Sequence, residues 1–254
     1  MIQELPKFFY IIRIFIGVNF FLKYRRSYFG FFWSLINPIF MISSIAFIFS
    51  SILNKDFFEY LFFIFAGMIP WLFISQSIYS SSNVYISNEV LIRKVKINLA
   101  ILPIANLLVV FFDSLITCLL YLILLGIKNV ELQFSLLQLI PAYIALILFC
   151  AGCALIFSIL TVYFRDLQWL IQMGMQTLFF LTPVLYRPDS LSGSAQFIVE
   201  LNPLTPLIQL FSNILNGQIV SVNAWIMSSL VAISIFSAGI GFYSFNRTRI
   251  IFRL

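Results

Sequence analysis

Long apolar runs, interrupted by short polar stretches, are the main pattern along the chain. A helix needs about 20 mainly apolar residues to cross the hydrocarbon core of a bilayer. Six segments reach that length: 31–53, 58–80, 100–126, 136–162, 167–186 and 222–245. Their apolar residues are continuous rather than alternating, which argues against a strand-built barrel. The pattern therefore predicts an all-α integral membrane protein with six transmembrane helices.

The N-terminal segment differs from these six. Its apolar core, 8–22, is short and contains Arg13, and its strongest basic cluster, Lys23, Arg25 and Arg26, comes after the apolar residues. A signal peptide would have its basic residues first and a small-residue cleavage site after them. We therefore predict an interface helix whose cations lie in the headgroup layer. A seventh, shortened span is the alternative.

The polar connection after the second predicted span is also patterned. From Ser87 to Ile97 it mixes apolar and charged residues in a way that allows one short amphipathic helix, with Ser87 or Asn88 as the N-cap. The charges of such a helix would be available to a cytoplasmic partner. A simple solvated loop is the alternative, and it leaves the apolar residues Val90, Leu91, Ile92 and Val95 unexplained.

The stretch before the last predicted span, 187–221, is too long for an ordinary connection. Asn202 followed by Pro203 indicates a helix start, and Gly217 indicates its C-terminal stop. Two short re-entrant helices that dip into the outer leaflet and return are predicted here, a shape that could line or close an exit. An interfacial cover with no gating role is the alternative.

Asp113, Arg165 and Asp166 are charged residues that need an explanation of their own. Asp113 lies inside the third span, where an ionisable group is costly. It would either pair with a cation of another helix, which we favour, or face a watery pathway. Arg165 and Asp166 mark the turn between the fourth and fifth spans. We favour a salt bridge that holds the inner ends of helices together, with contact to a cytoplasmic partner as the alternative.

Composition supports a membrane protein and narrows its chemistry. Of 254 residues, 62% are hydrophobic and 9% are charged, whereas soluble domains carry about 25% charged residues. The chain has no His and only nine carboxylates, which removes His-based acid–base catalysis and His metal ligation. Cys118, Cys150 and Cys153 all lie in apolar runs and are interpreted as small buried hydrophobes. No catalytic residue and no metal site are expected.

The basic residues predict the orientation of the chain. With the N-terminus inside, all but three of the 15 Lys and Arg residues lie on the inner side, the exceptions being Lys55, Lys128 and Arg187. The positive-inside rule then places both termini in the cytoplasm. The net charge of +6 is thus a topology signal, and no nucleic-acid partner is expected. An aromatic content of 18% would suit a passage for sugar rings, although composition alone does not decide this.

Six stretches, spread over nearly the whole chain, form a specific set, although each alone is a weak signal. They are LKYRRSYFGFFWSLINPIF (22–40), FAGMIPWLFIS (65–75), SNEVLIRKV (87–95), VYFRDLQWLIQ (162–172), LTPVLY (181–186) and LNPLTPLIQLF (201–211). Together, and in family order, they resemble the permease subunits of type-2 ABC exporters that move polysaccharide. That family includes O-antigen, capsule and teichoic acid exporters.

The resemblance implies one transmembrane domain over 1–254. Its parts would be a cytoplasmic interface helix (1–30), spans one to five (31–186), an outer gate region (187–221), and span six with a cytoplasmic tail (222–254). The segment 87–97 would be the coupling helix, which sits in a groove of the ATPase.

The resemblance also implies roles for particular residues. ATPase coupling would fall to Ser87, Glu89, Leu91, Arg93 and Lys94, and the outer gate to Asn202, Pro203, Leu204 and Pro206. Lys23, Arg25 and Arg26, at the inner headgroup level, would attract the pyrophosphate of a lipid-linked glycan. Ordinary topology-setting charge is their alternative role.

The resemblance further implies a homodimer in the bacterial inner membrane, surrounded by membrane lipid and bound to two copies of a separate cytoplasmic ATPase. The chain has no G-x-x-x-x-G-K-[ST] phosphate loop, so ATP and Mg are expected on that partner. This chain would bind no cofactor and would be a transport subunit rather than an enzyme. The expected cargo is a lipid-linked polysaccharide. The alternatives are another amphiphile, such as teichoic acid, a lipid or a drug, then a passive channel or an integral-membrane transferase.

Overall fold

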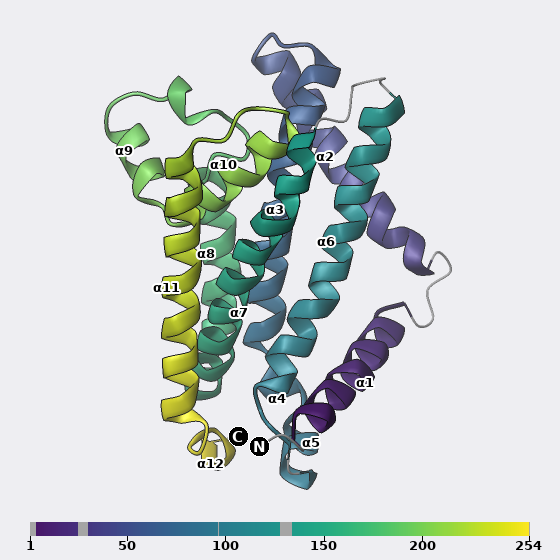
Figure 1. Cartoon of the computed structure of the whole chain (residues 1–254), viewed down its shortest axis with the longest axis vertical. Helices are drawn as coiled ribbons and strands as arrows, with labels where there is room; N and C mark the ends of the chain where they lie inside the picture. Colours follow the sequence, from purple (N-terminus) through teal and green to yellow (C-terminus); the bar gives the residue numbers. More distant parts are fainter. Residues whose placement is uncertain (1–3, 25–29, 96, 128–133, 254) are drawn as a thin grey trace.

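The computed structural model describes residues 4–24, 30–95, 97–127 and 134–253, and these residues form helices joined by short connections, without a strand (Figure 1). Five of the described helices are long and apolar enough to cross a membrane. They are α2 (Trp33–Ile52), α3 (Phe57–Ser82), α6 (Ile101–Ile127), α7 (Leu139–Tyr163) and α11 (Val222–Asn246). They correspond to the first four predicted spans and the last one, and they confirm the all-α fold.

The fifth predicted span is shorter than expected. Helix α8 (Leu167–Leu181) has 15 residues, or about 22 Å of helix against a hydrocarbon core of about 30 Å. It ends because Pro183 lacks a backbone N–H and disfavours helical geometry at the residue before it. Thr182 accordingly has extended dihedrals, with φ −112° and ψ 139°. The predicted helix through residue 186 is wrong at this end, and the count of six spans remains a prediction.

The remaining helices lie at the two ends of the bundle. α4 (Val84–Ser87), α5 (Glu89–Lys94), α12 (Ile250–Arg253) and both chain termini lie at one end, which we call the inner end. α9 (Ser194–Leu201) and α10 (Leu204–Leu215) lie at the opposite, outer end (Figure 1). The predicted pair of short helices before the last span is therefore confirmed as helices.

Helix α1 (Glu4–Tyr24) runs obliquely beside the inner part of α6 (Figure 1). Its apolar part, Tyr10–Asn19, is shorter than a membrane span. The structure thus confirms a helix in this segment, and its place at the membrane interface remains a prediction.

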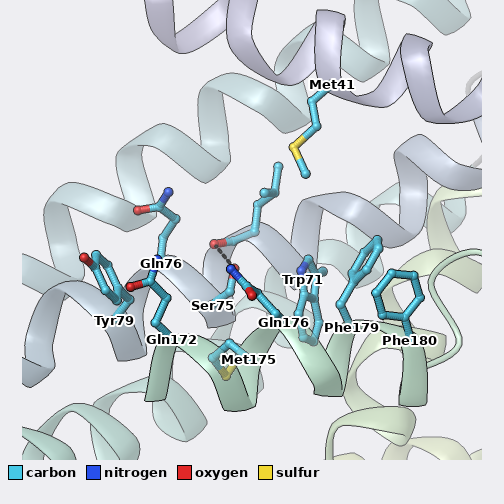
Figure 2. A pocket seen from close by; sticks show the side chains of 11 residues that line it. Met41, Trp71, Ser75, Gln76, Tyr79, Gln172, Met175, Gln176, Phe179 and Phe180 are labelled. Carbon is cyan, nitrogen blue, oxygen red and sulfur yellow. Dashed lines mark hydrogen bonds between the residues drawn. The ribbon is translucent and has the colours of Figure 1, made fainter. Parts of the chain in front are cut away.

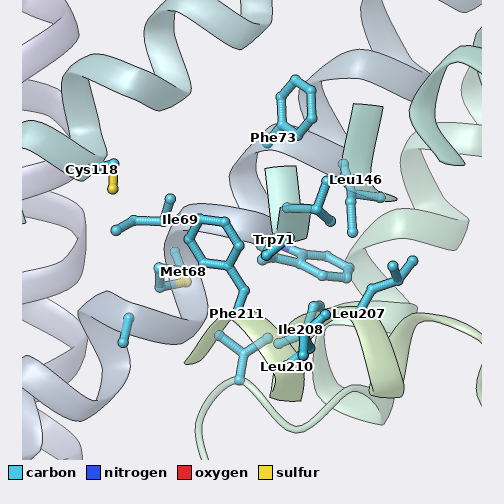
Figure 3. Close-up of a cluster of buried hydrophobic side chains, with 14 of the residues drawn as sticks. Met68, Ile69, Trp71, Phe73, Cys118, Leu146, Leu207, Ile208, Leu210 and Phe211 are labelled. Carbon is cyan, nitrogen blue, oxygen red and sulfur yellow. The ribbon is translucent and has the colours of Figure 1, made fainter. Parts of the chain in front are cut away.

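Helices α3 and α7 form the centre of the bundle. Within their spanning segments 61% and 67% of the residues are buried, against 17% for both α2 and α11. Apolar side chains from α3, α6, α7 and α10 meet there (Figure 3): Met68, Ile69, Trp71, Phe73, Cys118, Leu146, Leu207, Ile208, Leu210 and Phe211. The outer helices α2, α8 and α11 therefore leave most of their surface to lipid or to a partner.

Helix α11 is held on α7 through a backbone contact between two glycines. A Cβ added to Gly239 would lie 2.7 Å from Cα of Gly152, and one added to Gly152 would lie 2.4 Å from the carbonyl oxygen of Ile235. Such small residues let membrane helices approach closely and gain dispersion energy. The buried residues of α11 form one stripe: Ser228, Ala232, Gly239 and Asn246. This narrow stripe is the main attachment of α11 to the bundle.

The glycine contact predicts that Gly239→Leu destabilises the protein. The added side chain must push α11 away from α7, and overpacking of this kind costs about 1–3 kcal/mol. The midpoint of thermal unfolding in detergent should therefore fall. Gly241→Leu is the matched control, because no atom lies within 4 Å of a Cβ built there. Equal midpoints for the two variants would contradict the contact.

Candidate functional site

The segment predicted as a short amphipathic helix, 87–97, contains α5. Asn88 separates α5 from α4, which ends at Ser87. Asn88 occupies the N-cap position, but its side chain makes no capping hydrogen bond. Its amide instead donates backwards to the carbonyl of Val84 (2.8 Å) and to Oγ of Ser87 (3.2 Å). This local bond competes with helix continuation from α4 into α5. The predicted short helix with Asn88 at its N-cap position is confirmed, and it ends at Lys94 rather than at Ile97.

Helix α5 is anchored by one face and exposes the other. Ile92 is buried in a cluster at the inner end that also contains Val84, Tyr85, Leu99, Leu102, Ile159, Val162 and Ile250. Burial raises the pKa of the Tyr85 hydroxyl, so this residue stays uncharged. Val90, by contrast, is 66% exposed, and Leu91 is half-buried. Because α5 lies at the inner end of the bundle, packing among the described residues does not explain why an apolar side chain such as Val90 stands at this position.

The predicted coupling charges lie on the exposed side of α5. Nη2 of Arg93 and Oε1 of Glu89 are 2.9 Å apart, one helical turn from each other. A pair of this kind contributes about 0.3–0.5 kcal/mol, so a partner could exchange it for its own charges at little cost. Lys94 is exposed beside them. The sequence-based placement of the charges is thus consistent with the structure, and their role in coupling remains a prediction.

A groove lies between α3 and α8, and Met41 of α2 also lines it (Figure 2). Its volume is about 380 Å³. Its walls combine the aromatic rings of Trp71, Tyr79, Phe179 and Phe180 with the amides of Gln76, Gln172 and Gln176. The rings of Trp71 and Phe179 are 5.4 Å apart and close one side. Flat apolar faces beside amides that both donate and accept hydrogen bonds suit a ligand with apolar ring faces and many hydroxyls.

The glutamines of α8 form a row along one side of the helix. Gln168, Gln172 and Gln176 are spaced four residues apart and therefore share a face. Gln172 and Gln176 are exposed, and Ile171 is the only buried residue among those described in α8. An amide without a partner is costly in hydrocarbon, so this face is expected to meet water, cargo or another subunit. Sequence reasoning missed the row, although its four-residue spacing within an apolar run was the available signal.

A second cavity, of about 480 Å³, lies between α2, α3 and α6. Its polar lining comprises Ser34, Asn37, Gln76, Asp113, Ser114 and Thr117. Gln76 and Leu72 line both this cavity and the groove. Asp113 therefore faces a cavity with polar groups in its lining. Its two predicted roles, pairing with a cation of another helix and contact with a watery pathway, remain predictions.

At the outer end, the predicted gate residue Asn202 joins two helices. Its amide donates to Oγ1 of Thr182 (2.8 Å) and to the carbonyl of Leu181 (3.2 Å), at the end of α8. Its Oδ1 accepts from the backbone N–H of Leu204 (3.0 Å), at the start of α10. Pro203 occupies the N-cap position of α10. One buried amide thus satisfies the ends of both helices.

Helix α10 is a core element and not a free flap. The hydroxyl of Tyr121, on α6, donates to the carbonyl of Leu215 (3.3 Å), and the ring of Phe211 packs edge-on against Tyr143 of α7 with 4.8 Å between centroids. Pro206, also in α10, is half-buried. The predicted stop is confirmed: Gly217 has φ +69°, and the next N–H, of Gln218, donates back to the carbonyl of Asn213 (2.8 Å).

Arg165 and Asp166 lie in the predicted turn between α7 and α8, and both are exposed. Within the ranges that the structure describes, neither side chain forms an ion pair. The expected salt bridge therefore remains a prediction. The main-chain carbonyl of Asp166 instead starts α8 by accepting from Trp169 N (3.0 Å) and Leu170 N (3.3 Å).

The three predicted headgroup cations are not tested. Arg25 and Arg26 lie outside the described residues, and Lys23 falls in the last turn of α1. Among the described residues, no group of three or more His, Cys, Asp or Glu side chains is placed to hold a metal ion.

The structure combines membrane-length helices, a groove and a polar cavity between them, and a short helix at the inner end. These features are those of a multi-pass transport subunit. Comparison with known families is more specific. The chain belongs to the ABC-2 type transporter family, whose model matches residues 11–216.

Curated relatives carry one shared name. Two proteins of Klebsiella pneumoniae, each called O-antigen export system permease protein RfbA, are similar to the chain. One is 29% identical over 79% of this chain and 80% of its own length, and the other is 28% identical over 85% and 86%. A protein of the same name from Myxococcus xanthus is 25% identical over 73% of this chain and 72% of its own length.

The hydrogen bonds of Asn202 predict that Asn202→Ala loosens the outer end. The substitution leaves the buried Leu204 N–H and the Leu181 carbonyl each without one of its partners, which costs about 1–3 kcal/mol. Thermal unfolding in detergent should start at a lower temperature, and proteolysis in the 182–203 region should become faster. Asn223→Ala, at an exposed position at the start of α11, should change neither measurement. If the two variants behave alike, Asn202 does not hold this end together.

Proposed function

We propose that this chain is the membrane-spanning subunit of an ATP-driven exporter that moves lipid-linked, O-antigen-like polysaccharide from the cytoplasmic side across the bacterial inner membrane. The observation that carries the proposal is the groove between α3 and α8, in which aromatic rings and glutamine amides lie together inside a membrane bundle. The names of the curated relatives support the same cargo.

The groove alone is too open to be a passage, and a second copy of the chain would complete it. Helix α8 has one buried residue, Ile171, and exposes eight of its 15 residues, including Gln172 and Gln176. A two-fold related copy would set its own groove and glutamine row against this face, so that both rows border one water-filled path. In this homodimer α8, extended by the chain up to Arg187, would be the fifth of six spans in each subunit.

The inner end is proposed to face the cytoplasm. The described cations at that end include Arg93, Lys94, Arg165, Arg247, Arg249 and Arg253, whereas Lys55 and Arg187 lie at the outer end. This distribution agrees with the positive-inside rule. Both termini would then be cytoplasmic.

Energy is proposed to come from two copies of a separate ABC ATPase that carry the ATP and Mg. Helix α5 is the natural contact, because it protrudes at the inner end and presents Val90 together with Glu89, Arg93 and Lys94. Ser87 and Leu91 would complete this contact. No residue of this chain would hold a cofactor.

Cargo is proposed to enter from the inner leaflet. Lys23, Arg25 and Arg26 would attract the pyrophosphate of the carrier lipid. The polar cavity that contains Asp113 shares Gln76 and Leu72 with the groove, which offers the first sugars a hydrogen-bonding surface on their way. Asn202, Pro203, Leu204 and Pro206 would form part of the outer gate.

The groove predicts that the double variant Gln172→Leu/Gln176→Leu loses export while the protein still folds. Each lost hydrogen bond to cargo is worth about 1 kcal/mol, so export should fall by at least about tenfold. In a strain without the gene, complementation by the variant should leave lipid-linked glycan inside the cell and little at the surface.

Gln218→Leu is the matched control, because it changes an exposed glutamine outside the groove. Normal surface glycan in the strain without the gene would contradict the proposed function. Wild-type export by the double variant would contradict the role of the groove. Accumulation of a different amphiphile in the deletion strain would show another cargo.

The coupling contact predicts that Glu89→Arg weakens the complex with the ATPase. The change breaks the pair with Arg93 and adds a positive charge to a helix that already has two. If Glu89 faces a cation of the partner, copurification of the ATPase should fall by about tenfold, because like charges across an interface are repulsive. Glu200→Arg makes the same charge change at the outer end and should leave the complex intact. An unchanged complex with unchanged export would refute the assignment.

A further inference from the structure

Helix α11 makes a hydrogen bond to a different part of the protein at each of its ends. At the inner end the hydroxyl of Tyr243 donates to Oδ1 of Asn98 (2.8 Å), and the backbone N–H of Ala100 donates to the same tyrosine oxygen (3.1 Å). Asn98 and Ala100 lie in the connection between α5 and α6. The last span is therefore joined to the segment that follows the proposed coupling helix.

The inner end of α11 is further fixed to α7. The hydroxyl of Tyr163 donates to Oδ1 of Asn246 (3.1 Å), and Asn246 is buried. Just beyond, Ile250 is fully buried in the same cluster as Ile92 of α5. A displacement of α5 would therefore be transmitted to the end of α11 through packing as well as through hydrogen bonds.

At the outer end, α11 is joined to the proposed gate. Oγ of Ser228 donates to the carbonyl of Pro206 (2.9 Å), in the first turn of α10. Ser228 is fully buried, so water does not compete for this bond. Apart from the contact with α7, α11 is mostly exposed, and few other contacts absorb its movement.

Between these two ends, α11 has little freedom to bend. Ser228 and Tyr243 are 15 positions apart, which corresponds to about 22 Å of helix. The contact of Gly239 with Gly152 joins backbone to backbone, so no side chain can change rotamer to relieve a shift. A displacement of either end would therefore be carried by α11 as one body.

We propose that α11 relays the displacement of the coupling helix to the outer gate helix α10, with Tyr243 and Asn98 as positioning residues at the inner end and Ser228 at the outer end. The relay rests on the proposed function, because it assigns to α5 the contact with the ATPase. Through this relay, a displacement of α5 at the inner end would shift the core helix α10 at the outer end.

The test uses the complete complex of permease and cognate ATPase in proteoliposomes, with lipid-linked glycan extracted from the host membrane as the probe. ATP hydrolysis and glycan translocation are measured together. Tyr243→Phe and Ser228→Ala each remove one hydroxyl and keep the packing. Each should lower the glycan moved per ATP by about fivefold, the equilibrium effect of one ordinary hydrogen bond, while hydrolysis and the unfolding midpoint stay close to wild type.

Two further variants separate a relay from a local effect. The double variant should be no worse than the more severe single variant, because both hydroxyls serve one path. Asn98→Leu should uncouple, whereas Asn98→Asp keeps an oxygen that accepts from Tyr243 and should restore coupling. Ser234→Ala is the matched control on α11, since its hydroxyl bonds within its own helix, to the carbonyl of Val231.

Unchanged glycan per ATP in both single variants would overturn the relay. So would effects that multiply in the double variant, or a parallel fall of hydrolysis and unfolding midpoint, which would assign the hydroxyls a purely structural role. A wild-type complex that hydrolyses ATP but moves no glycan would contradict the proposed function and the relay with it.

Discussion

A polar group inside the hydrocarbon core must find a partner or water, and this constraint organises the bundle. Many hydroxyls meet it within their own helix: Ser44 donates to the Phe40 carbonyl, Thr161 to Phe157 and Thr177 to Met173. Asn202 meets it by satisfying the ends of two helices. The exposed amides of Gln172 and Gln176 are the contrast, since nothing within the described chain satisfies them. The constraint thus points from a single subunit to the partner, cargo or water that must cover α8.

The second organising feature is the close approach of α7 and α11. Because Gly152 and Gly239 lack side chains, α11 is held by a narrow stripe and still sits in one position. That position places Tyr243 at the inner connection and Ser228 at the outer helix. Because the contact between the two glycines involves backbone only, α11 is a rigid element. The hydrogen bonds of Tyr243 and Ser228 are therefore made by the two ends of the same rigid helix.

Much of the fold could be predicted from the sequence, because the length of an apolar run is enough to predict a span. The helix start at Asn202 and the stop at Gly217 were also readable, since both rest on local chemistry. The early end of α8 before Pro183 was not. It depends on backbone sterics that hydrophobic periodicity does not reveal. The turn at Arg165 and Asp166 was also readable, and both residues are exposed in it.

The groove could not be predicted, because it is assembled from α3 and α8, which are far apart in the sequence. The sequence showed aromatic richness, and it offered the glutamine spacing, but only the fold brings Gln76 and Trp71 opposite Gln176 and Phe179. Asp113 was recognised as unusual from its position alone, whereas the cavity that it faces required the placement of α2 against α6.

The central claim is that glycan passes along the groove, and site-directed photo-crosslinking tests it most directly. A photoreactive amino acid at position 176, in the complex with its ATPase, should form an adduct with radiolabelled lipid-linked glycan only while ATP is hydrolysed. The same amino acid at position 233, on the exposed face of α11, should label lipid and not glycan. Glycan adducts that are absent at 176, or equal at the two positions, would contradict the claim.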